Sequence, residues 1–264
     1  MSEKVCVITG GTSGIGKCTA EAMRRKGYAV YELSRRETGV AGFVHIPTDV
    51  TKPEMVDAAI AEVLRQEDHI DVLINNAGFG VSGAVEFTEP AAAKKQFEVN
   101  FFGMVNVCHA VLPVMRGAGH GRIVNLSSVA GVVPIPFQTY YSAGKAAVNS
   151  YTMALSNEVK PFGITVAAVM PGDIKTGFTA ARQKNIIGDD IYGGRISRSV
   201  AGMEKDEQTG MDPAAAGRFI ADVAMKNSRK PLYTIGLAYK GAVFLTKILP
   251  ARWLNGLIGM IYAK

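Results

Sequence analysis

The chain contains few cysteines and no pattern that would bind a metal ion. Three cysteines occur among 264 residues, and none belongs to a Cys-x-x-Cys pair. Neither a zinc site nor a disulfide framework is therefore expected. The four histidines also lack metal-ligand spacing, and we expect surface or packing roles for them. This cysteine usage favours a reducing compartment, so we predict a cytoplasmic protein without a bound metal.

Long apolar runs and basic blocks are missing as well. No run of 18 apolar residues occurs, which argues against a membrane-spanning helix. An apolar stretch starts near the N-terminus at Val5, so we expect no signal peptide before it. The net charge of +6 comes from bases spread along the chain, without interleaved aromatics, so nucleic-acid binding is not expected. Such a charge suits a phosphate-bearing cofactor or an anionic surface, or it serves solubility alone.

Strand and helix patterns alternate along the whole chain. Short apolar runs that predict buried strands lie at residues 5–9, 28–33, 43–46, 71–74, 122–126, 164–170 and 232–235. Helical stretches separate most of them. The alternation predicts an α/β fold, a Rossmann-type doubly wound parallel sheet of about seven strands with helices on both faces. No repeat or linker interrupts it, so we predict a single domain over residues 1–264.

A glycine-rich turn follows the first predicted strand. Gly10, Gly14 and Gly16 stand between that strand and a helical stretch from Lys17 to Lys26. Glycine allows a tight turn and a close approach of the backbone to a pyrophosphate. The amides at a helix start then face the negative charge. This strand-turn-helix context predicts a dinucleotide site.

The end of the second predicted strand indicates which dinucleotide binds. Ser34 stands where an acidic residue would bond the ribose 2′-hydroxyl of NAD, and Arg35 and Arg36 follow it. Guanidinium groups pair well with phosphate. We therefore predict NADP(H), with NAD(H) as the alternative. Glu32 lies close by, but we expect its strand position to keep it short of the ribose.

A tyrosine and a lysine are spaced for acid–base chemistry. Tyr141 and Lys145 are four residues apart in a predicted helix, so they share one face. A nearby cation favours the phenolate and lowers the pKa of a tyrosine, which brings it toward the working pH of a proton-transfer catalyst. The pair alone is a short pattern, and its weight depends on the other motifs.

These motifs together resemble the short-chain dehydrogenase/reductase family, most closely its branch of hydroxysteroid and retinol dehydrogenases. The resemblance covers about residues 3–236. The matching motifs are Thr9-Gly10-Gly11-Thr12-Ser13-Gly14-Ile15-Gly16, Asp49-Val50, Asn75-Asn76-Ala77-Gly78, Asn100, Ser128, Tyr141-x3-Lys145 and Pro171-Gly172.

The resemblance implies a role for four catalytic residues. Tyr141 exchanges a proton with the substrate oxygen, Lys145 lowers the pKa of Tyr141 and bonds the nicotinamide ribose, and Ser128 bonds the substrate oxygen. Asn100 holds a water that connects Lys145 to solvent. The implied cofactor site comprises Gly10, Thr12, Ser13, Gly14, Ile15, Gly16, Ser34, Arg35, Arg36, Asp49, Val50, Asn76, Ala77, Gly78, Tyr141, Lys145, Pro171, Gly172, Ile174 and Thr176.

The family pattern also bears on assembly and on the choice of cofactor. Its members usually form dimers or tetramers, so we expect a homodimer or homotetramer. Many members that use NADP(H) carry a base just before Gly14, where this chain has Ser13. The predicted NADP(H) preference therefore depends on Arg35 and Arg36.

The remaining segments concern the substrate. Residues 131–136 are almost wholly apolar and predict a cleft for a hydrophobic ketone or secondary alcohol, with a steroid among the candidates. Residues 177–211 are long, polar and without clear periodicity, which predicts a substrate lid. The apolar tail, residues 237–264, has three interpretations: a wall of the cleft, a subunit contact, or an amphipathic helix on a membrane surface. The first two are favoured.

Two alternative functions stay open at this point. One is a reductase of carrier-bound 3-ketoacyl groups, which would need basic residues at the cleft mouth. The candidates are Lys175, Arg182, Lys184, Arg195 and Arg198. The other is a non-catalytic NADP(H) sensor, against which the complete set of catalytic residues weighs.

Overall fold

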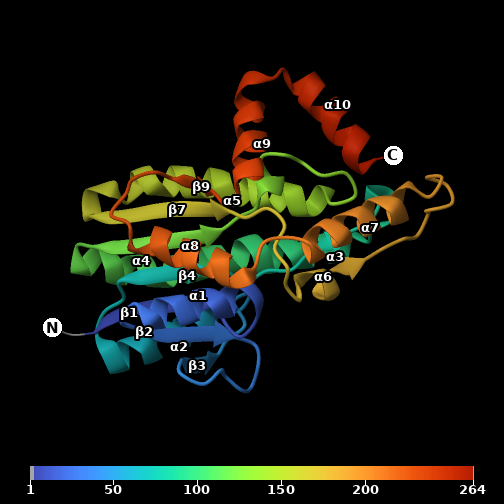
Figure 1. The fold of residues 1–264 in the computed structure, drawn as a ribbon. Helices are drawn as coiled ribbons and strands as arrows, with labels where there is room; N and C mark the ends of the chain where they lie inside the picture. Colours follow the sequence, from blue (N-terminus) through green and yellow to red (C-terminus); the bar gives the residue numbers. More distant parts are fainter. Residues whose placement is uncertain (1–2, 264) are drawn as a thin grey trace.

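A parallel sheet runs through the centre of the computed structural model, which describes residues 3–263 (Figure 1). Within those residues its seven strands follow the order β3-β2-β1-β4-β6-β7-β9. The strands are β1 (Lys4–Thr9), β2 (Tyr28–Ser34), β3 (Val44–Pro47), β4 (Val72–Asn75), β6 (Gly121–Leu126), β7 (Ile164–Met170) and β9 (Leu232–Thr234). Every pairing is parallel. The order reverses beside β1, as in a doubly wound sheet, so the predicted fold class is confirmed.

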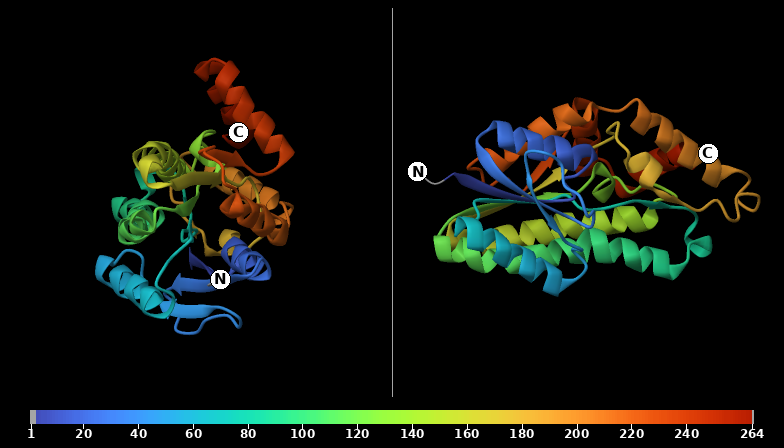
Figure 2. Two further views of the ribbon diagram at one scale, coloured as in Figure 1. Left: turned by 90° about the vertical axis from the view of Figure 1, so that its left-hand side faces the viewer. Right: turned by 90° about the horizontal axis from the view of Figure 1, so that it is seen from below.

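Helices cover both faces of the sheet (Figure 2). One layer consists of α1 (Gly14–Arg25) and α8 (Pro213–Met225), and the other of α2 (Pro53–Glu67), α4 (Gly103–Ala118) and α5 (Thr139–Glu158). Alternate residues of β1 supply the two cores, since Val5 and Val7 belong to one apolar cluster and Cys6 and Ile8 to the other. A strand buried on both faces needs apolar residues at every position, which explains the continuous runs in the sequence.

Two predicted helix starts need correction. The first helix begins at Gly14, three residues earlier than expected, so two of the motif glycines lie in its first turn. The sequence Thr51-Lys52-Pro53-Glu54 predicts a second helix that Thr51 caps. Thr51 does not cap α2, because Lys52 precedes the helix and the Thr51 hydroxyl donates to Asp49 Oδ1 at 2.8 Å. The hydrogen bond to Asp49 in the preceding turn therefore replaces the capping hydrogen bond that Thr51 was expected to make.

The helical stretch that carries Asn100 is continuous but not uniform. α3 (Pro90–Phe97) leads through a wide π turn at Glu98–Phe102 into α4. Over its whole length, Pro90–Ala118, this stretch is long and apolar enough to cross a membrane by length and composition. Val107, Val111 and Met115 of the same helix are fully buried in the core shared with the sheet, so its apolar character is used in packing.

The predicted lid is not a structureless loop. Residues 177–211 contain α6 (Phe178–Ala181), β8 (Gln183–Lys184), which pairs with β5 (Val81–Ser82), and α7 (Arg195–Gln208). Ile196, Val200 and Met203 are buried on one side of α7. Their spacing is helical, but the many charged and small residues between them hid it in the sequence.

The apolar tail folds into two helices that stand out from the body (Figure 1, red). They are α9 (Leu237–Ile248) and α10 (Ala251–Tyr262), joined by a short turn at Pro250. Short 3-10 turns elsewhere occupy Val85–Phe87, Val129–Gly131 and Lys160–Phe162. We call α9 and α10 together the C-terminal hairpin.

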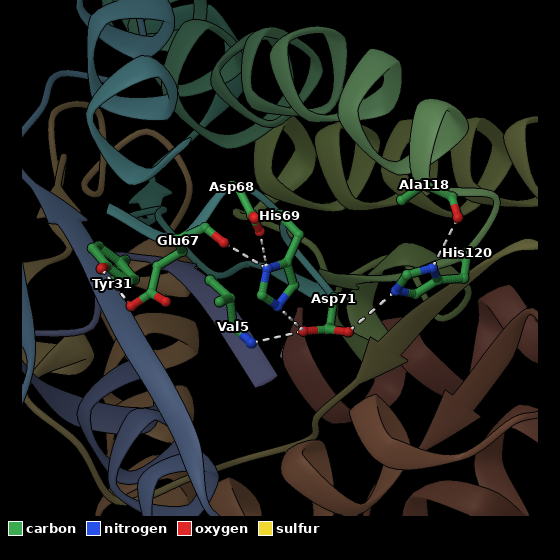
Figure 3. Close-up of polar contacts among 8 residues, drawn as sticks. All are labelled: Val5, Tyr31, Glu67, Asp68, His69, Asp71, Ala118 and His120. Atoms are coloured by element: carbon green, nitrogen blue, oxygen red, sulfur yellow. Dashed lines mark hydrogen bonds and ion pairs between the residues drawn. The ribbon is translucent and has the colours of Figure 1, made fainter. Parts of the chain in front are cut away.

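Two of the four histidines lie around a carboxylate at the edge where the strands begin (Figure 3). Asp71 accepts the Val5 amide at 2.7 Å, and the Nε2 atoms of His69 and His120 lie 3.4 and 3.3 Å from its oxygens. His69 Nδ1 also lies 2.8 Å from Asp68 Oδ1. The hydrogen bond to Asp68, with the Glu67 carbonyl and Asp71, raises the pKa of His69 above its usual 6.5.

A raised pKa in the folded state makes protonated His69 stabilising. Its contribution is fully present below pH 6.5 and is lost as the pH rises through the raised value. We therefore expect His69→Gln to reduce the free energy of unfolding most at acidic pH, with the difference from wild type shrinking as the pH rises. Urea unfolding at several pH values measures this, with the exposed His109→Gln as control. A difference independent of pH would contradict the assignment.

Candidate active site

One cavity of about 900 Å³ opens at the carboxyl ends of the strands. Every residue that the sequence predicted for catalysis or cofactor binding lines it. From the turns after β1, β2 and β3 come Gly10, Thr12, Ser13, Gly14, Ile15, Gly16, Ser34, Arg35, Arg36, Asp49 and Val50; from the segments around β4, β6, α5 and β7 come Asn76, Ala77, Gly78, Asn100, Ser128, Tyr141, Lys145, Pro171, Gly172, Ile174 and Thr176. Residues far apart in the sequence meet here because parallel strands end at one edge.

The glycine turn has the shape that a pyrophosphate requires. Gly10 has a φ of +66°, and a Cβ on Gly16 would lie 2.2 Å from the Gly10 carbonyl oxygen. The Asn76 amide group donates to the Thr9 and Gly10 carbonyl oxygens, both at 3.0 Å, and so ties the turn to β4. No side chain caps the start of α1. Its first amides therefore remain available to an anion, which fits a dinucleotide phosphate.

A buried carboxylate under the turn holds it in place. Glu32 is fully buried, accepts the Gly11 amide at 2.8 Å and lies 2.6 Å from His45 Nδ1. Glu32 itself does not line the cavity. That Glu32 stays short of the ribose remains a prediction. Its supporting role was not predicted, although a lone acid inside an apolar strand is a sign of a buried partner.

We expect Glu32→Ala to lower the free energy of unfolding by about 3 kcal/mol, because a buried amide and a buried imidazole lose their acceptor. The affinity for NADPH should fall as well, since Gly11 is released. Urea unfolding and fluorescence titration with NADPH measure the two effects. Glu37→Ala, which removes an exposed carboxylate from the same segment, should change neither. Unaltered stability in Glu32→Ala would show that the turn is held by other contacts.

The two arginines after β2 are exposed on the cavity edge. Within residues 3–263 neither Arg35 nor Arg36 has an ion-pair partner. The Ser34 hydroxyl donates to Glu32 Oε2 at 3.3 Å. Two exposed cations that no carboxylate pairs with suit a 2′-phosphate.

The proposed proton donor lies where α5 meets the end of β6. Tyr141 is only partly exposed and shares a hydrogen bond with Ser128. Burial raises the pKa of Tyr141 to about 12, while the Ser128 hydrogen bond and the charge of Arg182 act to lower it. The tyrosine is therefore protonated at neutral pH, as a proton donor must be.

Lys145 is buried below Tyr141. Its Nζ donates to the Leu126 carbonyl oxygen at 2.7 Å and lies 5.7 Å from the centroid of the Tyr141 ring. Burial lowers the pKa of Lys145 to about 8. The Lys145 ammonium group donates to the Leu126 carbonyl oxygen and not to the Tyr141 hydroxyl. That Lys145 lowers the pKa of Tyr141 therefore stays a prediction.

Asn100 lies in the π turn and makes two hydrogen bonds to the loop after β4. Its Oδ1 accepts the Phe79 amide at 3.0 Å, and its Nδ2 donates to the Phe79 carbonyl at 2.8 Å. Single π turns often occur at functional sites, because they change the direction of one side chain within a helix. The partner that a buried asparagine requires is thus the loop after β4.

Several residues of the cavity were not assigned to it from the sequence, among them Asp173, Glu207 and Tyr239. Arg182, proposed for the cleft mouth, has a side chain only 1% exposed and pairs with Glu207. Asp173 accepts a hydrogen bond from Tyr239 of α9, whose ring covers Gly172. Asp173 directly follows the Pro-Gly motif, which was a usable signal. The tail carried no pattern that would place Tyr239 over the site.

The C-terminal hairpin forms one wall of the cavity. The hairpin residues that line it are Tyr239, Ala242, Leu245, Leu254, Leu257, Ile258, Ile261 and Tyr262. This placement agrees with the interpretation of the tail as a cleft wall. Across the part of the chain that the structure describes, no group of three or more His, Cys, Asp or Glu residues could hold a metal ion.

A doubly wound sheet, a phosphate-binding turn and a Tyr–Lys–Ser cluster at one cavity define a nicotinamide-dependent oxidoreductase. A family model described as short chain dehydrogenase matches residues 4–186. The chain belongs to the short-chain dehydrogenase/reductase family.

Known relatives agree with this assignment. The chain is 39% identical to 3-ketodihydrosphingosine reductase of Bacteroides thetaiotaomicron over all of its own length and 92% of the relative. A short-chain dehydrogenase from Streptomyces avermitilis superimposes with a TM-score of 0.82 at 30% identity, covering 98% of each chain. ElxO with NADP bound superimposes with a TM-score of 0.75 at 26% identity, covering 90% of this chain and 99% of that one.

Proposed function

We propose that the protein is an NADP(H)-dependent reductase of a long-chain hydrophobic ketone. The observation that carries this proposal is the cavity, which joins the dinucleotide turn, Tyr141 and an apolar wall in one space. The two unpaired arginines after β2 support NADP(H) over NAD(H). The similarity to a 3-ketodihydrosphingosine reductase supports a long-chain ketone.

The lining of the cavity suits a molecule with a polar head and an apolar chain. Asp173, Arg182 and Glu207 line it and lie close enough to Tyr141 to act on its pKa. The hairpin lines another part with leucine and isoleucine side chains. A ketone flanked by polar groups would place its head beside Tyr141 and its chain along the hairpin. A steroid, the other candidate from the sequence, would use only the apolar part.

The proposed chemistry uses the hydroxyl groups of Tyr141 and Ser128 and the ammonium group of Lys145. A bound nicotinamide would supply the hydride to the carbonyl carbon. Tyr141 donates its proton to the carbonyl oxygen, and Ser128 holds that oxygen with a second hydrogen bond. Lys145 and Asn100 carry the roles implied by the family: contact with the ribose and a water path that reprotonates Tyr141.

The alternative reductase of carrier-bound acyl groups has weaker support. Its basic residues should lie free at the cavity mouth to meet an acidic carrier. Arg182 is buried against Glu207, Lys184 pairs with Glu204, and Arg195 donates to the Ala263 carbonyl at 2.7 Å. These three of the five candidate bases therefore already have partners within the protein.

Three further features belong to the same proposal. Residues 177–211 act as the lid, since Phe178, Met203 and Glu207 reach the cavity.

A homodimer or homotetramer forms through α4 and α5, near which Phe102 and Met153 are exposed. The cytoplasm is the compartment, in keeping with three free cysteines. Sedimentation equilibrium of wild type and Met153→Asp tests the assembly.

The test of the function is NADPH oxidation against ketones of increasing chain length. We expect kcat/KM to rise with chain length and to exceed the values for steroids, for small polar ketones and for carrier-bound 3-ketoacyl groups. NADPH binding without turnover of any ketone would favour the sensor alternative. Highest activity on carrier-bound substrates would replace the proposed substrate class.

A further inference from the structure

The outer face of the C-terminal hairpin exposes large apolar side chains that do not line the cavity. These are Leu237, Phe244, Ile248, Trp253 and Met260. Leu237 is 86% exposed and Trp253 is 69% exposed. Exposed apolar side chains gathered on one element mark a contact surface, because a lone folded chain gains nothing from them.

The hairpin is lightly attached to the body (Figures 1 and 2). α9 has no fully buried residue, and α10 has one, Ile258. Its polar ties are Tyr239 to Asp173 at the start and the Ala263 carbonyl to Arg195 at the end. The structure therefore holds the hairpin at its two ends and leaves its outer face uncovered.

The charge of this region has one sign. Asp222 is the last acidic residue, and the chain after it carries only bases: Lys226, Arg229, Lys230, Lys240, Lys247, Arg252 and Lys264. Lys240, Lys247 and Arg252 lie on the hairpin and are exposed, and among the described residues none has an ion-pair partner. The exposed bases favour an anionic partner. The apolar side chains beside them favour a partner that is also apolar.

We propose that the C-terminal hairpin docks the protein on an anionic lipid surface. Amphipathic helices with bases beside tryptophan, phenylalanine and leucine lie in the plane of such a surface. A second copy of this chain fits less well, because a two-fold contact through the hairpin would oppose basic residues to basic residues. The two interpretations of the tail are therefore compatible. The inner face of the hairpin forms a wall of the cavity, and the outer face docks on the lipid surface.

Docking also explains how a poorly soluble ketone reaches the site, a step that rests on the proposed function. The inner face of the hairpin lines the cavity and the outer face meets the lipid. A substrate could then pass from the bilayer along Leu245, Leu257 and Ile261 to Tyr141 without crossing water. The product alcohol would return by the same path.

Trp253 makes the proposal directly measurable, since it is the single tryptophan of the chain. The full-length protein is mixed with vesicles of phosphatidylcholine with and without phosphatidylglycerol. With phosphatidylglycerol we expect co-sedimentation, a blue shift of Trp253 emission and quenching by brominated acyl chains, all weakened by salt. With phosphatidylcholine alone we expect much weaker binding.

Paired variants separate the apolar and the charged contributions. Lys240→Glu with Lys247→Glu should weaken partitioning by at least about tenfold, because each base near an anionic membrane contributes measurably. Phe244→Ser with Met260→Ser should reduce both binding and quenching. The matched controls, Arg116→Glu with Lys160→Glu and Phe162→Ser, remove similar groups at the opposite edge of the sheet and should bind like wild type.

Three results would overturn the proposal. They are no binding to phosphatidylglycerol vesicles, equal binding by the hairpin and control variants, and a hairpin-dependent dimer that buries Trp253 without lipid. NADPH oxidation with a water-soluble ketone, measured without vesicles, reports the proposed function separately. All hairpin variants should retain that activity, so a failure of docking and a failure of catalysis are distinguishable.

Discussion

Tyr141→Phe is expected to reduce kcat by about 100- to 10,000-fold, the range that general acid catalysis contributes. The substitution removes only the hydroxyl that would protonate the carbonyl oxygen. The ring keeps its tilted contact with Phe178, whose centroid lies 5.9 Å away. The affinity for NADPH should therefore change little.

Tyr140→Phe is the matched control for this experiment, since it removes a hydroxyl one residue away that does not line the cavity. Pre-steady-state mixing with NADPH and fluorescence titration separate chemistry from binding. Wild-type turnover in Tyr141→Phe would remove this residue from the mechanism. A large loss of NADPH affinity would instead assign it a binding role.

Arg35→Asp is expected to shift the ratio of NADPH to NADH affinities toward NADH by about ten- to a hundredfold. A charge-assisted hydrogen bond to the 2′-phosphate is lost, and a carboxylate now repels that phosphate. The same carboxylate can accept the ribose 2′-hydroxyl of NADH.

Arg116→Asp makes the same charge change on α4, away from the cavity, and should leave the ratio unaltered. Isothermal titration with both dinucleotides gives the two affinities in one protein preparation. An unchanged ratio in Arg35→Asp would mean that the exposed arginines do not select the cofactor, and NAD(H) would become the equal alternative.

The sequence predicted the sheet well because its strands are buried on both faces. β1 and β7 need apolar residues at every position, so short apolar runs identify them without a tertiary context. The predicted site residues also meet at one cavity, because the motifs follow strands that end at a common edge. α7 was missed because only Ile196, Val200 and Met203 mark its inner side.

Contacts between residues far apart in the sequence could not be predicted from it. Glu32 supports Gly11 from a neighbouring strand, and Arg182 is neutralised by Glu207, which is 25 residues away. Nothing local to either residue indicates these partners. The tail is the clearest case, since its helices have apolar residues on more than one side and only the packing shows which side lines the cavity.

The central claim is a hydride transfer from NADPH to a long-chain ketone beside Tyr141. The most direct measurement uses NADPH deuterated at both C4 positions, with mass spectrometry of the product alcohol. The account predicts one deuterium on the carbinol carbon with wild type, and a strongly reduced yield with Tyr141→Phe. An alcohol without deuterium, or a yield that Tyr141→Phe leaves unchanged, would contradict it.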